Sequence, residues 1–240
     1  MVITNAELKN LKKLKDKKYR RLQNLFLVEG IKLCEEVIKS NFKIVHTLSS
    51  NEKYKDYPNF VLVGDEALKS IATTETPQDI ICVCEIPTTQ QSLPKGNSLI
   101  LDNLQDPGNI GTLIRSAVAF DFKDIYFINT ADIYSEKVIR GSMGAIFKVN
   151  AHVVDKDYIK SNKNSICDLL IGTDLNSENL SSVDTTKKIG LIIGNEGNGV
   201  SKELLEITDK NVTLAMANNV ESLNAGVAGS ILMYNIFSKN

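Results

Sequence analysis

Three short polar segments carry the side chains best suited to chemistry. The first holds Asn109 and Arg115, the second holds Glu196 among glycines, and the third holds Ser222 and Asn224. Each segment follows an apolar stretch of strand length. A loop at the carboxyl end of a parallel strand is the usual place for a binding crevice in an open α/β sheet. The sequence therefore predicts one site built from three loops.

The second segment, residues 194–201, predicts a loop that approaches a ligand closely. Three of its first six residues are glycine, and glycine tolerates positive φ and close backbone contact. The loop lacks the Lys-Ser/Thr ending of a P-loop and the G-x-G-x-x-G spacing of a dinucleotide fold. A glycine loop with a carboxylate and no lysine favours a ligand that is not a polyphosphate.

The first segment predicts a turn followed by an amphipathic helix. Pro107-Gly108 is typical of a turn, and Asn109 is a candidate N-cap. Helical spacing places Arg115 roughly 140° from the centre of the apolar stripe. Arg115 is therefore expected to point away from the core. The stripe consists of Ile110, Leu113, Ile114, Ala117 and Val118.

The third segment predicts a helix that packs closely against another backbone. Polar residues 221–224 open the helix, and its next turns are mostly alanine and glycine. Glycine lowers helix propensity, so close packing is the expected compensation.

The elements that position these segments fall into two predicted domains, residues 1–92 and 93–240. Residues 87–96 contain prolines, threonines and glutamines and are expected to form the linker. The second domain alternates strands with helices, which predicts an α/β fold with a mostly parallel sheet and helices on both faces. Its strands are predicted at 98–101, 124–128, 168–171, 189–193 and 211–214.

These segments, in this order and spacing, resemble the three motifs of the SpoU (TrmH-type) RNA ribose 2′-O-methyltransferases of the SPOUT superfamily. Residues 19–30 also resemble the N-terminal substrate-binding module of many such enzymes, and residues 138–145 resemble the segment between the first two motifs. Two departures occur. The third motif usually opens with Ile-Pro-Met, whereas Ala215 replaces the proline here, and Ala225-Gly226 stands where the family often has Val-Ser or Val-Ala.

The resemblance implies a trefoil knot in the second domain, a homodimer, S-adenosylmethionine as the methyl donor and RNA as the substrate. It implies catalytic roles for Asn109, Arg115, Glu196, Ser222 and Asn224. It implies cofactor binding by Thr173, Gly194, Asn195, Gly197, Leu214, Met216 and Leu223. It implies RNA contacts for Arg20, Arg140 and Ser142. A guanidinium stays protonated in proteins, so Arg115 is expected to bind a phosphate or stabilise an alkoxide rather than act as a base.

The charge distribution agrees with an RNA substrate. Residues 1–21 contain eight Lys/Arg and two Asp/Glu, a net charge of +6, whereas the remaining 219 residues contain 20 and 27, a net charge of −7. This lysine block adjoins the substrate-binding module and is expected to contact RNA phosphates. An ordinary solvated helix is the alternative interpretation.

Other sequence features narrow the class of protein. No apolar run reaches membrane-spanning length and no signal peptide is recognised, so a cytoplasmic protein without a membrane partner is expected. Cys82 and Cys84 have no nearby histidine or second cysteine pair, so no metal site is expected. All four cysteines are predicted to be buried, reduced thiols.

Three functional hypotheses remain open at this stage. Ribosomal RNA is the favoured substrate because the N-terminal module resembles ribosomal-protein-like RNA binders. Transfer RNA is the alternative substrate, and a non-catalytic RNA-binding protein of the same fold is the alternative function. The joint presence of the five polar site residues argues against loss of catalysis. A nucleotide-dependent enzyme is excluded by the missing phosphate-binding fingerprint.

Overall fold

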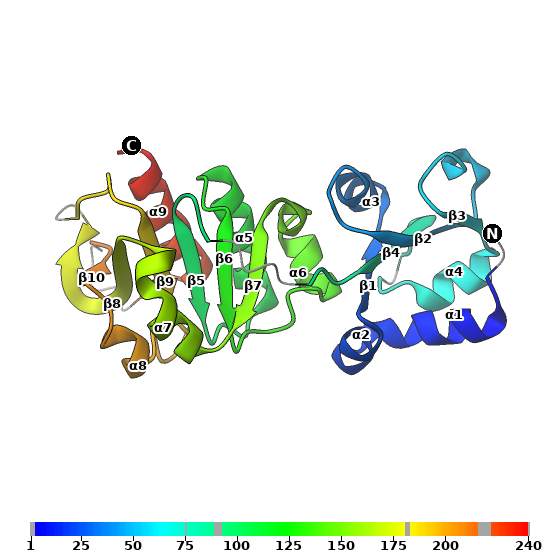
Figure 1. Cartoon of the computed structure of the whole chain (residues 1–240). Coiled ribbons are helices and arrows are strands. Elements are labelled where there is room, and N and C mark those ends of the chain that lie inside the picture. The colour runs from blue at the N-terminus through cyan, green and yellow to red at the C-terminus, as the bar shows by residue number, and fades with distance from the viewer. Residues whose placement is uncertain (1–2, 75, 89–92, 181–182, 216–221, 240) are drawn as a thin grey trace. The chain divides into compact units, whose positions relative to one another are not determined.

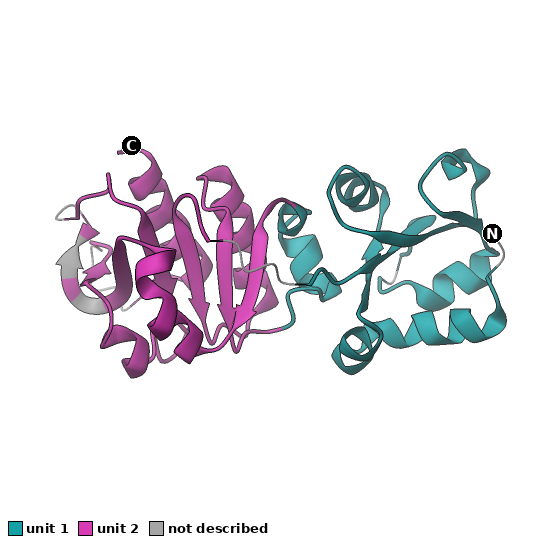
Figure 2. Cartoon of the chain, viewed as in Figure 1, with its two compact units in different colours: residues 1–88, 132–147 teal, residues 89–131, 148–240 magenta. Residues whose placement is uncertain are grey.

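The computed structural model describes residues 3–74, 76–88, 93–180, 183–215 and 222–239. The chain forms two compact units (Figure 2), unit 1 from residues 1–88 and 132–147, and unit 2 from residues 89–131 and 148–240. The sequence placed one boundary at residues 92 and 93. The structure adds residues 132–147 to the N-terminal unit, and part of the predicted linker lies outside the described residues.

Unit 1 contains a mixed four-stranded sheet in the order β1-β4-β2-β3. Strand β4 runs antiparallel to β1 and β2, whereas β2 and β3 are parallel. The strands are β1 (Leu25–Glu29), β2 (Ile44–Ser49), β3 (Phe60–Leu62) and β4 (Ile80–Glu85). The helices are α1 (Asn5–Lys12), α2 (Lys17–Gln23), α3 (Ile31–Ile38) and α4 (Asp65–Ile71), with short 3-10 helices at Lys13–Lys15 and Glu52–Tyr54.

The N-terminal helical region is divided into α1 and α2, which are joined by the 3-10 helix Lys13–Lys15. Thr4 and Glu7 form a reciprocal capping box at the start of α1. The Asp16 side chain accepts a hydrogen bond from the Lys18 backbone N–H and so starts a second helix, α2. Asn24 then ends α2 in the left-handed conformation, with φ of 54°.

Residues 132–147 pack against β1 within unit 1. They contain α6 (Glu136–Gly141) and the start of the 3-10 helix Ala145–Lys148. The Phe26 ring centroid lies 4.8 Å from that of Tyr134 and 6.5 Å from that of Phe147. Arg20 also forms an ion pair of 2.6 Å with Asp132. Apolar packing and a shielded ion pair therefore hold this segment in unit 1.

Unit 2 contains six parallel strands in the order β10-β8-β9-β5-β6-β7, which confirms the predicted α/β fold and parallel sheet. The edge strand β7 was not predicted, because its sequence Asn-Ala-His-Val-Val is partly polar and its Val153 side chain is 60% exposed. The strands are β5 (Ser98–Asp102), β6 (Asp124–Ile128), β7 (Asn150–Val154), β8 (Leu169–Asn179), β9 (Ile189–Ile193) and β10 (Lys210–Thr213).

Helices cover both faces of the unit 2 sheet, as the sequence predicted (Figure 1). Helices α7 (Lys156–Ile166) and α8 (Lys202–Leu205) pack over Ile100, Tyr126 and Ile192. Helices α5 (Pro107–Ala119) and α9 (Ala225–Phe237) lie on the other face. The predicted stripe on α5 is confirmed, since Ile110, Leu113, Ile114 and Ala117 are fully buried.

Candidate active site

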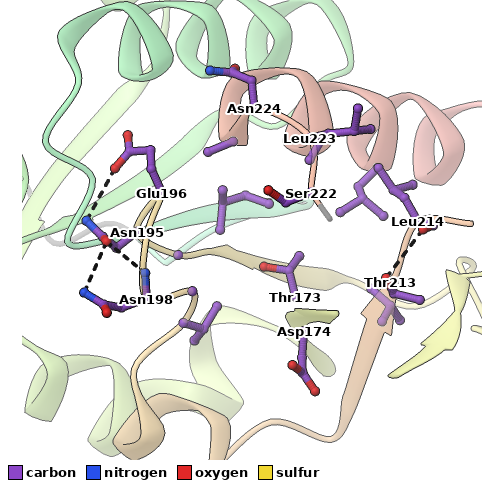
Figure 3. A pocket seen from close by; sticks show the side chains of 18 of the residues that line it. Thr173, Asp174, Asn195, Glu196, Asn198, Thr213, Leu214, Ser222, Leu223 and Asn224 are labelled. Carbon is purple, nitrogen blue, oxygen red and sulfur yellow. Dashed lines mark hydrogen bonds between the residues drawn. The ribbon is translucent and has the colours of Figure 1, made fainter. Parts of the chain in front are cut away.

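A cavity of about 690 Å³ lies within unit 2, beside the middle of β8, at the ends of β9 and β10 and at the start of α9. Figure 3 shows Asn195 and Glu196 on one side of it and Thr213 and Leu214 on the opposite side. Most predicted site residues line this cavity: Thr173, Gly194, Asn195, Glu196, Gly197, Leu214, Ser222, Leu223 and Asn224. Met216 lies outside the described residues.

The loop after β9 is closed by its own backbone. Asn195 and Gly199 exchange two backbone hydrogen bonds of 3.0 and 2.9 Å. A Cβ at Gly194 would approach the Gly199 carbonyl carbon and the Val200 nitrogen to 2.1 Å, so a side chain at this position is sterically excluded. Gly199 adopts a φ of +67°. Gly194 and Gly199 are therefore required by the loop shape, as the sequence suggested, whereas Gly197 has room for a side chain.

Both ends of this loop are tied to the end of β5. The Asn195 side-chain amide donates to the Asn103 carbonyl at 2.9 Å, and the Ser201 backbone N–H donates to Asp102 Oδ2 at 2.8 Å. Asp102 is 1% exposed, and both its Oδ1 and the Ser201 Oγ are buried without a hydrogen-bond partner. Sequence reasoning missed Asp102, although a carboxylate closing an apolar strand directly before the first motif was a usable signal.

Asn109 and Glu196 connect the first two motifs. Asn109 Nδ2 donates to Glu196 Oε1 at 3.0 Å, so the two side chains meet across the crevice. Asn109 is not the N-cap. The Asp106 side chain accepts the Asn109 backbone N–H at 2.7 Å, so α5 begins at Pro107 and Asn109 occupies its third position. Proline suits the first helical position, which explains the earlier start.

Helix α9 packs closely on α5, as its small residues predicted. A Cβ at Gly229 would lie 2.4 Å from Leu113 Cδ2, and one at Gly226 would lie 3.3 Å from Asn109 Oδ1. The Ser116 and Ser230 hydroxyls are 2.7 Å apart and share a hydrogen bond. This approach brings the start of the third motif beside Asn109.

The third motif opens α9 later than expected. The helix begins at Ala225, and Asn224 is its N-cap, accepting the Val227 N–H at 3.2 Å. Asn224 therefore has a capping role as well as a position on the cavity wall. Ser222 and Leu223 precede the helix and are exposed, with their side chains at the cavity (Figure 3).

Thr173 and Asp174 reach the cavity through an irregularity in β8. Asn211 pairs with Gly172, whereas the next residue, Val212, pairs with Glu178, so residues 173–177 lie between two consecutive pairings. The Thr173 hydroxyl donates to the Ile192 carbonyl at 3.1 Å. The strand therefore continues to Asn179, beyond the predicted end at residue 171.

Arg115 lies on the exposed face of α5 and outside the cavity wall. Its direction away from the apolar stripe agrees with the helical spacing. No carboxylate of the described part of the chain forms an ion pair with it. Its guanidinium is accessible to a ligand from solvent.

Three residues predicted to contact RNA lie in unit 1. Arg20 is 7% exposed and donates to Asp132 and to the Leu14 and Lys15 carbonyls. Ser142 is fully buried and donates to the Ile139 carbonyl. This placement gives Arg20 and Ser142 structural hydrogen bonds, and their contact with RNA stays a prediction. Arg140 is exposed and pairs with Glu136 at 2.6 Å.

Both parts of the chain match known protein families in sequence. The SpoU rRNA Methylase family matches residues 96–234, and the MRM3-like substrate binding domain matches residues 5–82. The chain belongs to the SpoU rRNA methylase family. The fold and motif order of unit 2 are therefore those of a SpoU methylase.

Relatives extend this match to the whole chain. The chain is 33% identical over 246 residues to the Bacillus subtilis (strain 168) protein "23S rRNA (guanosine(2553)-2'-O)-methyltransferase RlmP", covering 97% of this chain and 96% of the relative. A putative RNA methyltransferase of the TrmH family from Porphyromonas gingivalis superposes with a TM-score of 0.89 at 27% identity, covering 99% of each chain. The AdoMet complex of the Streptomyces viridochromogenes SpoU methyltransferase AviRb shares the fold, with a TM-score of 0.88 at 24% identity over 98% of both chains.

The cysteines of this SpoU methylase are buried thiols. All four cysteines are buried and free of disulfides, as predicted, and burial raises the pKa of Cys167 to about 11. Within the described ranges, no three His, Cys, Asp or Glu side chains are grouped so that they could hold a metal ion. No helix in this part of the chain is long and apolar enough to cross a bilayer.

Proposed function

We propose that this protein transfers a methyl group from S-adenosylmethionine to a ribose 2′-hydroxyl of ribosomal RNA. The whole-length likeness to a Bacillus subtilis 23S rRNA 2′-O-methyltransferase carries this proposal. The cavity supports it, because it joins the second and third motifs and is linked to the first through Asn109 and Glu196. Residues 1–92 would bind RNA and residues 93–240 would carry the transfer.

The cavity suits S-adenosylmethionine in size and charge. Its volume lies within the range of about 300 to 1,000 Å³ that is usual for small-molecule sites. Asp174 and Glu196 line it, and no Lys, Arg or His is among its described lining residues. Two carboxylates favour a cationic ligand over a polyphosphate. Leu214 and Leu223 would face the adenine, with Gly194 and Gly197 beside it.

The bound cofactor would supply a methyl group already activated on a cationic sulfonium. The chain must then orient the ribose hydroxyl and allow its proton to leave. Glu196 is held by Asn109 at 3.0 Å, so its carboxylate is fixed at the wall between the motifs. Ser222 has an exposed side chain at the cavity and would contact the substrate. Arg115 would bind the neighbouring phosphate or stabilise the developing alkoxide.

We propose a homodimer formed through α9. Val227, Ile231 and Tyr234 are 45%, 38% and 53% exposed, and their spacing of four and three residues places them on one helix face. Phe120, at the C-terminal end of α5, contacts the Tyr234 ring, with the two ring centroids 5.6 Å apart. A second copy would cover this apolar face. Sedimentation of a monomer at micromolar concentration would contradict this.

A trefoil knot in unit 2 is part of the proposal. Strand β10 lies at the sheet edge beside β8, while the following helix α9 returns to pack on α5 and β9. Such a return of the C-terminal chain toward the sheet centre is what a threaded C-terminus requires. The proposed RNA substrate favours a cytoplasmic site of action.

The function can be tested with purified full-length protein and labelled S-adenosylmethionine. We expect label in ribosomal RNA from a strain lacking the gene and little label in RNA from the parent strain. Mass spectrometry should then place one 2′-O-methylated nucleotide. Label in transfer RNA alone would make transfer RNA the substrate. Binding of ribosomal RNA without transfer to any RNA would leave a non-catalytic RNA-binding protein.

A further inference from the structure

Exposed positive charge surrounds one aromatic ring on unit 1. Lys13 Nζ lies 5.5 Å from the centroid of the Tyr19 ring, and Lys18 Nζ lies 5.9 Å from it. Both lysines are exposed and Tyr19 is half-buried. The ring is therefore accessible at the surface, with an ammonium group from each of two neighbouring elements beside it.

The fold fixes this ring in place. Lys13 belongs to the 3-10 helix after α1, and Tyr19 lies in the first turn of α2. Lys13 Nζ donates to Asn10 Oδ1 at 3.3 Å, and Gln23 Nε2 donates to the Asn10 carbonyl at 3.4 Å. The Gln23 contact connects α2 to α1, and the Lys13 contact connects the 3-10 helix to α1. Tyr19 is therefore held at a junction of two helices.

The acidic residues nearby are occupied by helix capping. Glu7 is bonded to Thr4, and Asp16 accepts the Lys18 backbone N–H at 2.7 Å. Within the described residues, no ion pair neutralises the exposed cations of this region. These exposed cations are Lys9, Lys12, Lys13, Lys15, Lys17, Lys18 and Arg21. The surface around Tyr19 is therefore strongly positive.

We propose that Tyr19, Lys13 and Lys18 form a binding site for one unpaired nucleotide of RNA. The base would stack on the Tyr19 ring, and its flanking phosphates would bind the two lysines. The proposal rests on the proposed RNA substrate and adds that this surface recognises an unpaired base. A lysine displaced from the ring exchanges a weak contact with the ring for a phosphate.

A base explains this combination better than an acidic protein or an RNA duplex. Carboxylates could bind the lysines, but they have no aromatic surface that could stack on the Tyr19 ring. Bases inside a duplex are already stacked on each other and are not available to a side chain. Recognition of RNA by stacking on tyrosine is typical of single-stranded loops, bulges and ends.

The test compares single-stranded and duplex RNA binding to the full-length protein. Fluorescence anisotropy would measure the affinity of a labelled oligoadenylate and of a duplex with the same number of phosphates. We expect Tyr19→Leu to weaken single-strand binding by about tenfold and duplex binding by less than about twofold. Tyr19→Phe keeps the ring and should bind nearly as wild type does. Thermal melting of each variant checks the fold.

The lysines have a different expected signature. Lys13→Gln and Lys18→Gln should weaken both RNAs and reduce the salt dependence of binding, because each removes a phosphate contact. Lys32→Gln is the matched control, since Lys32 is an exposed lysine of unit 1 on α3. It should leave the single-strand preference unchanged.

Several outcomes would overturn the stacking site. They are equal losses for single-stranded and duplex RNA in Tyr19→Leu, wild-type affinity in that variant, or no single-strand binding by the wild type. Equal displacement of RNA by polyglutamate from wild type and Tyr19→Leu would indicate general charge attraction. Methyl transfer is measured separately. Single-strand binding that depends on Tyr19 without any transfer would overturn the proposed function and leave this site standing.

Discussion

Each unit buries a carboxylate at the end of a strand, and the two have different surroundings. Glu29 ends β1 in unit 1 and is 8% exposed. Its two oxygens accept hydrogen bonds from the backbone N–H and hydroxyl groups of both Thr73 and Thr74. Asp102 ends β5 in unit 2, is 1% exposed and accepts only the Ser201 N–H, which leaves Oδ1 without a partner.

This difference separates a structural carboxylate from one beside a site. Four donors around Glu29 satisfy a buried charge and fix residues 73 and 74 to the sheet. Asp102 instead has an unsatisfied oxygen directly below the glycine loop that lines the cavity. An incompletely satisfied buried group costs folding free energy. In unit 2 this unfavourable group lies at the end of a strand beside the proposed active site.

The largest expected effect tests whether the chemistry resides in unit 2. Arg115→Ala should lower methyl transfer at saturating RNA by about a hundredfold or more, because one electrostatic stabiliser is lost. Cofactor affinity should stay near normal, since Arg115 is outside the cavity wall. Arg115→Lys should also be poorly active, because a point charge does not reproduce planar two-point contact with a phosphate. Turnover and calorimetry measure the two quantities.

A pure phosphate-binding role for Arg115 has another signature. Loss of transfer in Arg115→Ala would then be largely recovered at saturating RNA. Near-normal turnover at both low and high RNA concentrations would contradict any role for Arg115 in the reaction.

Matched amide substitutions compare the two buried carboxylates directly. Glu29→Gln turns an amide donor toward the Thr73 and Thr74 donors, so we expect a loss of about 2 to 3 kcal/mol in the free energy of unfolding. Asp102→Asn can keep the acceptor for Ser201 N–H and replaces only an oxygen that has no hydrogen-bond partner, so its loss should stay below about 1 kcal/mol. Urea unfolding measures both. Exposed Glu66→Gln is the control, and similar losses at Glu29 and Asp102 would refute the distinction.

A pH titration tests whether the stability of unit 2 depends on the protonation of the buried Cys167 thiol. Burial raises the pKa of Cys167 to about 11 from an unperturbed 9.0, so the folded state keeps a proton that the unfolded state releases. The resulting stability is fully present below pH 9 and is lost as pH rises from 9 to 11, by about 2 kcal/mol. Calorimetric melts of Cys167→Ala should show a flatter pH dependence in this window. The same pH dependence in Cys167→Ala and wild type would show that Cys167 is not responsible for this loss of stability.

The smallest expected effect concerns the loop attached to β5. Asp102→Ala removes the acceptor for Ser201 N–H, so cofactor affinity should fall by about tenfold, the equivalent of one hydrogen bond. The KM for RNA should change little. Ser98→Ala is the matched control, because it removes a buried, unpaired hydroxyl from the opposite end of β5. Equal cofactor affinity in Asp102→Ala and wild type would show that the loop does not need this attachment.

The sequence by itself predicted the elements whose signals are local. The stripe from Ile110 to Ala117, the need for glycine in the loop after β9 and the close packing of α9 follow from periodicity and from the size of single residues, and the structure confirms them. The SpoU family was also visible, because its motifs are continuous in the chain. The roles of Arg115 and Ser222 stay predictions.

Only the tertiary structure decided which residues meet across long sequence separations. Arg20 is bonded to Asp132, and Asp102 to Ser201, through contacts that no local pattern encodes. The structure also decided the start of α5, because the Asp106 side chain accepts the Asn109 backbone N–H and makes Asp106, not Asn109, the N-cap. Residues 132–147 belong to unit 1 because their aromatic rings pack against Phe26 of β1 and Phe42 of the loop between α3 and β2. Burial and hydrogen-bond satisfaction depend on the folded surroundings, and a sequence gives the groups but not their neighbours.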